Sequence, residues 1–175
     1  MTCAEQIKLR LAEGYGVMTD YYKRFREGVI ELHSSGRGKK ELAKIIGPLP
    51  VGKEENYLAM IAGYKKFLGA KDISWFIPKR SVWKHGNLEV AVNPELGLIW
   101  GEERFLVKLY MKADKPSKDR VICVLALMHE TLKAQKCQVG LLDVRNGKLY
   151  EYDHTMSGLI RLAESEALSL EHLLR

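Results

Sequence analysis

VNPELGLIWGEERFLVKLYMKAD, from Val92 to Asp114, is the stretch that decides the fold. Two apolar runs of strand-like composition flank the polar tetrapeptide GEER, which predicts a β-hairpin with its turn at residues 101–104. Alternate residues of a strand point to opposite faces of a sheet, so the second strand should have one core-facing side and one polar side. The core side would hold Phe105, Val107, Leu109 and Met111, and the other side Leu106, Lys108, Tyr110 and Lys112.

The polar side of this hairpin is the candidate functional site. Pairing through GEER would bring Glu95 or Asn93 within reach of Lys108 or Lys112. A carboxylate beside lysines suits phosphodiester chemistry, because the carboxylate holds Mg²⁺ or Mn²⁺, the metal activates water, and lysine stabilises the developing charge. The candidate catalytic residues are therefore Glu95, Lys108 and Lys112, with Glu95 as the metal ligand. Alternatively, Lys108, Tyr110 and Lys112 form the solvated face of an edge strand.

The chain before residue 70 is expected to be helical. Apolar residues recur at helical spacing from Ala4 to about His33, and SSGRGKK (34–40) then predicts a loop. A short helix is expected at 39–46, ending at Gly47-Pro48. A longer one should run from residue 53 or 54 to Leu68, with Gly69 as its stop.

Strands and helices should alternate after residue 72. Strands are expected at 73–77 and 88–93, with Pro94 breaking the pairing, and Ser117 should cap an apolar helix that reaches about Lys133. CQVGLLDV and LYEYD should form a second hairpin around Asn146-Gly147. The sequence thus predicts an α/β (α+β) fold with a mixed sheet and a crossover helix. We expect one domain, 1–175, with helical residues 1–70, sheet and crossover helix at 72–153, and C-terminal helices at 154–175.

This order of elements resembles the PD-(D/E)XK, or restriction endonuclease-like, fold, and is most similar to its RecB-type branch. There, a hairpin with an acidic residue on one strand leads to a (D/E)-x-K strand, then to a helix packed on the sheet and a further strand. The hairpin, the helix SKDRVICVLALMHETL and the strand QVGLLDVRNGKLYEYD follow that order, over roughly residues 85–153. The resemblance implies a restriction endonuclease-like core and an ancestry in nucleic-acid phosphodiester chemistry.

The (D/E)-x-K motif itself is incomplete. Glu95 stands for the first acid, but Leu106 replaces the second if Lys108 is the motif lysine, and Tyr110 replaces it if Lys112 is. Acids that could substitute from elsewhere are Glu54, Glu55, Glu89, Glu102, Glu103 and Asp114. The departure favours a catalytically degenerate protein, and the alternative is a metal-dependent nuclease with a rearranged site.

The charge of the chain indicates a class of partner. The net charge is +6, and the first 90 residues carry the whole excess, with 16 Lys/Arg against 10 Asp/Glu. A basic half attracts DNA or RNA, although a solvated lysine-rich helical surface would have the same composition. No apolar run approaches the roughly 18 residues of a membrane span, so no membrane partner and a cytoplasmic location are expected.

Three hypotheses about function follow. The first is a non-catalytic module that binds nucleic acid through the basic half and through Lys108, Tyr110 and Lys112, with tryptophans stacking on bases. The second is an active Mg²⁺- or Mn²⁺-dependent nuclease. The third is a homodimeric interaction protein that uses its long first helix and its leucine-rich tail, LSLEHLL.

Two other groups of polar residues do not form a motif. HETLK (129–133) begins like the zinc-protease motif HExxH, but Lys133 stands where the second histidine is required. Asp153-His154 is a carboxylate–imidazole pair with no nucleophile near it in the sequence. We therefore assign no function to either group from the sequence.

Overall fold

The computed structural model describes residues 20–49, 51–133 and 136–174. The part of the first predicted helix that precedes residue 20 lies outside these residues. The elements are α2 (Lys23–Ser34), η2 (Lys39–Glu41), α3 (Leu42–Ile46), α4 (Glu54–Leu68), β1 (Ser74–Phe76), β2 (Ser81–His85), β3 (Leu88–Val92), β4 (Leu96–Trp100), β5 (Glu103–Tyr110), α5 (Lys118–Leu132), β6 (Gln138–Asp143), β7 (Lys148–Glu151), η3 (His154–Leu159) and α6 (Ile160–Leu174).

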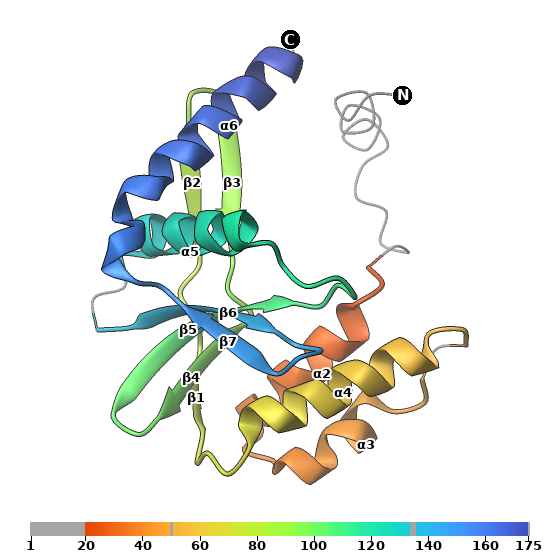
Figure 1. The fold of residues 1–175 in the computed structure, drawn as a ribbon. Helices are drawn as coiled ribbons and strands as arrows, with labels where there is room; N and C mark the ends of the chain where they lie inside the picture. The colour runs from red at the N-terminus through yellow and green to blue at the C-terminus, as the bar shows by residue number, and fades with distance from the viewer. Residues whose placement is uncertain (1–19, 50, 134–135, 175) are drawn as a thin grey trace.

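The architecture is a five-stranded mixed sheet between two helical layers. The strand order is β1-β4-β5-β6-β7, with β5 and β6 parallel and every other neighbouring pair antiparallel. Figure 1 shows α5 on one face of the sheet and α2, α3 and α4 on the other. Because parallel neighbours need a long connection, α5 is the crossover between β5 and β6, as the sequence predicts. The mixed α/β class is confirmed.

One face of the sheet packs on α2, α3 and α4. All four residues predicted for the core side of β5 lie in this core, beside buried side chains of α2 and α4 such as Phe25 and Tyr64. A glycine in α4 permits the close approach: a Cβ at Gly63 would lie 2.1 Å from the carbonyl oxygen of Val144. The helix therefore lies directly against the loop between β6 and β7.

The other face of the sheet is buried by α5. Ser117 caps this helix, as predicted, by accepting a hydrogen bond from the backbone N–H of Arg120 at 3.3 Å. Leu106 and Tyr110 are buried against this layer, with 1% and 8% of their surfaces exposed. The prediction that Lys108, Tyr110 and Lys112 form the solvated face of an edge strand is wrong, because β5 is the central strand and both its faces are covered.

The strands β2 and β3 form a separate two-stranded ribbon. They pair only with each other in the described part of the chain, and Pro94 lies between β3 and β4, where it breaks the pairing as predicted. In Figure 1 the ribbon extends from the sheet beside α6, which also packs on α5. The C-terminal tail thus contacts its own chain.

Candidate functional site

The candidate site lies where β5 and β6 end, and we call this end of the sheet the C-terminal edge. It carries Glu95, Lys108, Tyr110, Arg120 and Asp143. The antiparallel register pairs Leu96 with Val107, and one further step places Glu95 opposite Lys108. Of the approaches that the sequence left open, Glu95 or Asn93 to Lys108 or Lys112, the structure has Glu95 and the Asn93 carbonyl at Lys108.

Glu95 has partners for both of its carboxylate oxygens. Lys108 Nζ donates to Oε1 at 2.7 Å, and the backbone N–H of Leu109 donates to Oε2 at 2.9 Å. Lys108 Nζ also donates to the carbonyl of Asn93 at 3.0 Å. The Glu95 side chain is only 11% exposed. A divalent metal would therefore have to displace a lysine from a largely buried carboxylate.

The second acid of the motif has no place in this strand. Leu106, two residues before Lys108, is packed under α5, and a carboxylate there would be buried without a partner. The other alignment fails in a different way, because β5 ends at Tyr110 and Lys112 lies beyond it, exposed, in the connection to α5. Arg120 Nη1 donates to the buried Tyr110 hydroxyl at 3.2 Å.

A buried acid on the neighbouring strand was not predicted from the sequence. Asp143, the last residue of β6, is 2% exposed and pairs in register with Tyr110, so the two side chains lie on the same face of the sheet. Its carboxylate accepts hydrogen bonds from the backbone and the side chain of Asn146, at 3.3 and 2.7 Å. These bonds hold the β6–β7 turn. The signal in the sequence was an acid ending an apolar strand just before Asn146-Gly147.

Cations surround this edge. A cavity of about 630 Å³ beside Asp143 has three lysines in its wall, Lys66, Lys115 and Lys148. Lys112 and Lys115 lie in the exposed connection that leads to α5. Within the described ranges, no three His, Cys, Asp or Glu residues are grouped closely enough to hold a metal. Exposed or cavity-lining lysines thus give this edge a positive character among the described residues.

The basic residues of the first half are more scattered. Ion pairs join Arg26 to Asp20 and Arg37 to Glu31, so local acids offset part of the excess charge. Other basic side chains donate to backbone carbonyls; Lys39, for example, donates to the carbonyl of Gly69.

Together these features define a mixed α/β protein with a lysine–glutamate pair at the C-terminal edge of its sheet. Comparisons of the chain with protein-family models, curated proteins and solved structures give no match. No helix in residues 20–49, 51–133 or 136–174 combines the length and apolar character needed to cross a membrane.

Proposed function

We propose that this chain is a cytoplasmic, catalytically degenerate protein of PD-(D/E)XK-like fold that binds nucleic acid at its C-terminal edge. The order of elements supports the fold assignment. A β4–β5 hairpin with an acid before its first strand is followed by a helix packed on the sheet and by β6, which is parallel to β5. This is the order that the resemblance implies.

The observation that carries the loss of catalysis is the state of Glu95. Lys108 and the N–H of Leu109 occupy both of its oxygens, and apolar Leu106 fills the position of the missing acid. A lysine paired with a carboxylate contributes less to a bound phosphate. The contact with nucleic acid therefore depends chiefly on the neighbouring exposed cations, Lys112 and Lys115.

Binding through these cations should be salt-dependent, because each neutralised phosphate releases counterions. The experiment is fluorescence anisotropy with short labelled DNA and RNA, single- and double-stranded, between about 50 and about 200 mM salt. For duplex DNA, the double variant Lys112→Ala/Lys115→Ala should bind more weakly and lower the slope of log K against log salt by about 2.

The matched control removes two exposed lysines from the helical half, Lys40→Ala/Lys44→Ala. An equal loss of affinity in both variants would show that the general positive charge of the protein is responsible, and would exclude the C-terminal edge as the site. If the wild type does not bind at low salt, nucleic acid is not the partner.

A metal-dependent nuclease is the second candidate, and Asp143 is the observation that favours it. This carboxylate lies on the same face as Lys108, one strand away, and could supply a second acid if Asn146 released it. Such a site would cleave nucleic acid with Mg²⁺ or Mn²⁺, and both Glu95→Ala and Asp143→Asn would abolish cleavage.

The homodimer stays a prediction. Leu168 of α6 is 56% exposed and could contribute to an interface, whereas Ala167 beside it is buried within the chain. The mass of the protein by sedimentation over a range of concentrations tests this. A mass that stays at that of one chain would contradict the dimer.

A further inference from the structure

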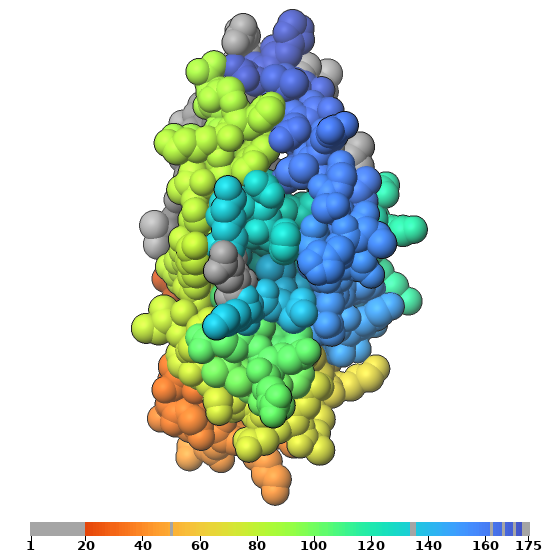
Figure 2. All heavy atoms as spheres, turned by 90° about the vertical axis from the view of Figure 1, so that its left-hand side faces the viewer, coloured from red at the N-terminus to blue at the C-terminus, as the bar shows by residue number. Residues whose placement is uncertain are grey.

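A second cavity lies at the opposite end of the sheet, where β5 and β6 begin. Its volume is about 700 Å³, within the usual range for small-molecule sites. The walls come from the start of β5, the C-terminal end of α5, the start of β6 and the segment after β7. Figure 2 shows the face of the molecule where these segments meet around a hollow. We call it the His129 cavity.

Three aromatic rings form one wall of this cavity. The Tyr152 ring stacks on His129 with centroids 4.0 Å apart and planes 7° apart, and His154 stands nearly perpendicular to both. The antiparallel pairing of β7 with β6 brings them together, continued by the hydrogen bond from Tyr152 N–H to the Val139 carbonyl at 2.9 Å. The two histidines that the sequence analysis left without a function thus share one wall.

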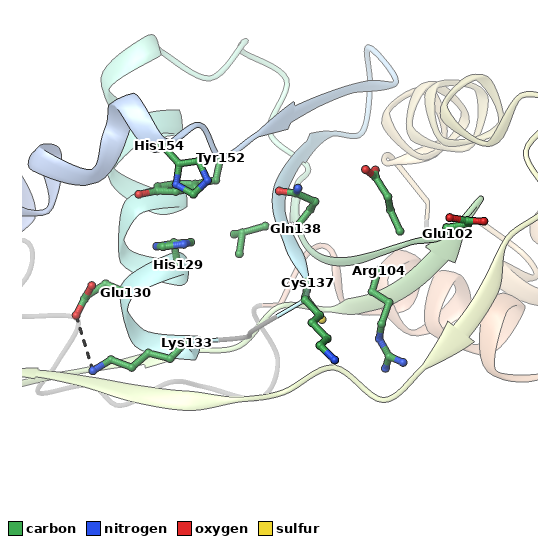
Figure 3. A pocket seen from close by; sticks show the side chains of 12 residues that line it. Glu102, Arg104, His129, Glu130, Lys133, Cys137, Gln138, Tyr152 and His154 are labelled. Carbon is green, nitrogen blue, oxygen red and sulfur yellow. Dashed lines mark ion pairs between the residues drawn. The ribbon is translucent and has the colours of Figure 1, made fainter.

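The stack leaves one ring face for a ligand. Tyr152 covers one face of His129, and in Figure 3 the other face is turned toward the ion pair of Glu130 and Lys133, which also line the cavity. Burial, with the nearby charges of Glu130 and Asp153, raises the pKa of Tyr152, so its phenol stays neutral. A planar ligand ring can therefore extend the stack on His129, as bases do on aromatic side chains.

Acidic and basic side chains line both sides of the cavity. Arg104, at the start of β5, lies with its guanidinium 4.1 Å from the centroid of the Phe76 ring, and this contact holds the guanidinium in place. Lys136 is also part of the wall. On the α5 side Glu130 is paired with Lys133, and the carbonyl end of the helix disfavours an anion. An anionic group would therefore bind on the Arg104 side, across the cavity from His129.

The cavity also contains carboxylates, which provide hydrogen-bond acceptors for a ligand. Glu102 and Glu103 line the cavity beside Arg104, and Glu130 lines it beside His129. They accept hydrogen bonds from hydroxyl or amino groups. A simple anion would meet as many acids as cations, and an apolar ligand would leave these groups without partners. A ligand with a flat ring, hydroxyl or amino donors and one anionic group satisfies all of them.

We propose that the His129 cavity binds a nucleotide, with the base stacked on His129 and the phosphate held by Arg104 and Lys136. The ligand is either a free mononucleotide or the terminal nucleotide of a strand. This inference does not depend on the proposed function, because the C-terminal edge is at the far end of β5, where Lys108 and Tyr110 lie.

Calorimetric titration with AMP, GMP, CMP, UMP and inorganic phosphate tests it, with the imidazole C–H signals followed by NMR. We expect saturable binding of one nucleotide that shifts the signals of His129 and His154, and binding of inorganic phosphate at least about tenfold weaker, since it lacks the stacked ring. A trinucleotide with a 5′-phosphate identifies the source. Tighter binding than the mononucleotide indicates a strand terminus, and equal binding indicates a free nucleotide.

The variants His129→Ala and Arg104→Ala remove the two ends of the site, and both residues are exposed, so neither change should unfold the protein. Each should weaken nucleotide binding about tenfold. The variant His129→Phe should instead bind nucleotides about as tightly as the wild type, because it keeps a ring on which the base can stack. Lys112→Ala/Lys115→Ala should leave it unchanged. The proposal is overturned if no nucleotide binds saturably, if inorganic phosphate binds as tightly as the nucleotides, or if binding persists in both single-alanine variants.

Discussion

Lys108 Nζ lies 2.7 Å from Glu95 Oε1, across two antiparallel strands whose register sets these residues opposite each other. The pair is formed where a metal would be held if the site were catalytic. Its carboxylate is 11% exposed, compared with 61% for Glu89 in the Lys84–Glu89 pair on the surface of the β2–β3 ribbon. The two pairs therefore provide a comparison between a partly buried and an exposed ion pair in one protein.

Glu95→Ala should lower the free energy of unfolding by about 2 kcal/mol, because it leaves Lys108 and the N–H of Leu109 without their acceptor. Glu89→Ala is the matched control and should cost less than about 0.5 kcal/mol, as exposed pairs contribute little. Urea unfolding measures both. Equal losses in the two variants would show that the Glu95 pair has no special structural role.

We expect no hydrolysis of DNA or RNA by the wild type with Mg²⁺ or Mn²⁺, because Glu95 is already paired and Leu106 cannot bind metal. The assay uses single- and double-stranded substrates and gel analysis of products. Cleavage that needs the metal and disappears in Asp143→Asn would contradict this prediction and establish a rearranged nuclease site.

The stability of the protein should fall in mild acid because of His33. Burial lowers the pKa of this imidazole to about 4. Its Nε2 shares a 2.7 Å hydrogen bond with the buried Tyr64 hydroxyl, and its ring stacks on Trp75. The unfolded chain takes up a proton below its ordinary pKa of about 6.5, whereas the folded protein does not until about 4, so stability decreases as the pH falls between these values.

The loss from His33 alone should approach about 3 kcal/mol between pH 7.5 and pH 4, at about 1.4 kcal/mol for each pKa unit. His33→Gln keeps a side chain able to bond to Tyr64 but does not titrate. Unfolding in urea at several pH values should give a smaller decrease for the variant than for the wild type. If the two curves are parallel between pH 6.5 and 4, His33 does not cause the loss.

Gly63→Ala should destabilise the protein by about 2 kcal/mol, although alanine is the better helix former by about 1 kcal/mol. The added methyl group would lie within 2.4 Å of the carbonyl oxygens of Val144 and Arg145, which belong to the loop that α4 contacts. Gly158→Ala is the control, since a Cβ there meets nothing within 4 Å. In thermal unfolding, the midpoint temperature should fall for Gly63→Ala and should stay the same or rise for Gly158→Ala. An unchanged midpoint for Gly63→Ala would show that α4 can move away from the loop.

The sequence was sufficient for the elements whose signals are local. The N-cap at Ser117, the turn at Asn146-Gly147 and the end of α4 at Gly69 appear as predicted, because capping and turn chemistry depend on a few adjacent residues. The β4–β5 hairpin forms as predicted, but its turn is residues 101–102 and not 101–104, because β5 already begins at Glu103, which pairs with Trp100. This shorter turn sets the register that brings Glu95 opposite Lys108.

The position of β5 in the sheet is not a local property. Its alternation of apolar and polar residues suits an edge strand as well as a central one, and only the pairing with β6 and the cover of α5 bury Leu106 and Tyr110. The same packing decides that a second acid has no room at residue 106.

The sequence by itself therefore determined most of the described helices and strands and the presence of the β4–β5 hairpin, because each depends on residues that are near one another along the chain; it did not predict β2 (Ser81–His85) or which lysine Glu95 meets. Only the tertiary structure decided that β5 is central, that Asp143 lies beside the candidate site, and that His129, Tyr152 and His154 line one cavity. These depend on contacts between distant segments, whose geometry is set by packing around the α5 crossover and not by any local pattern.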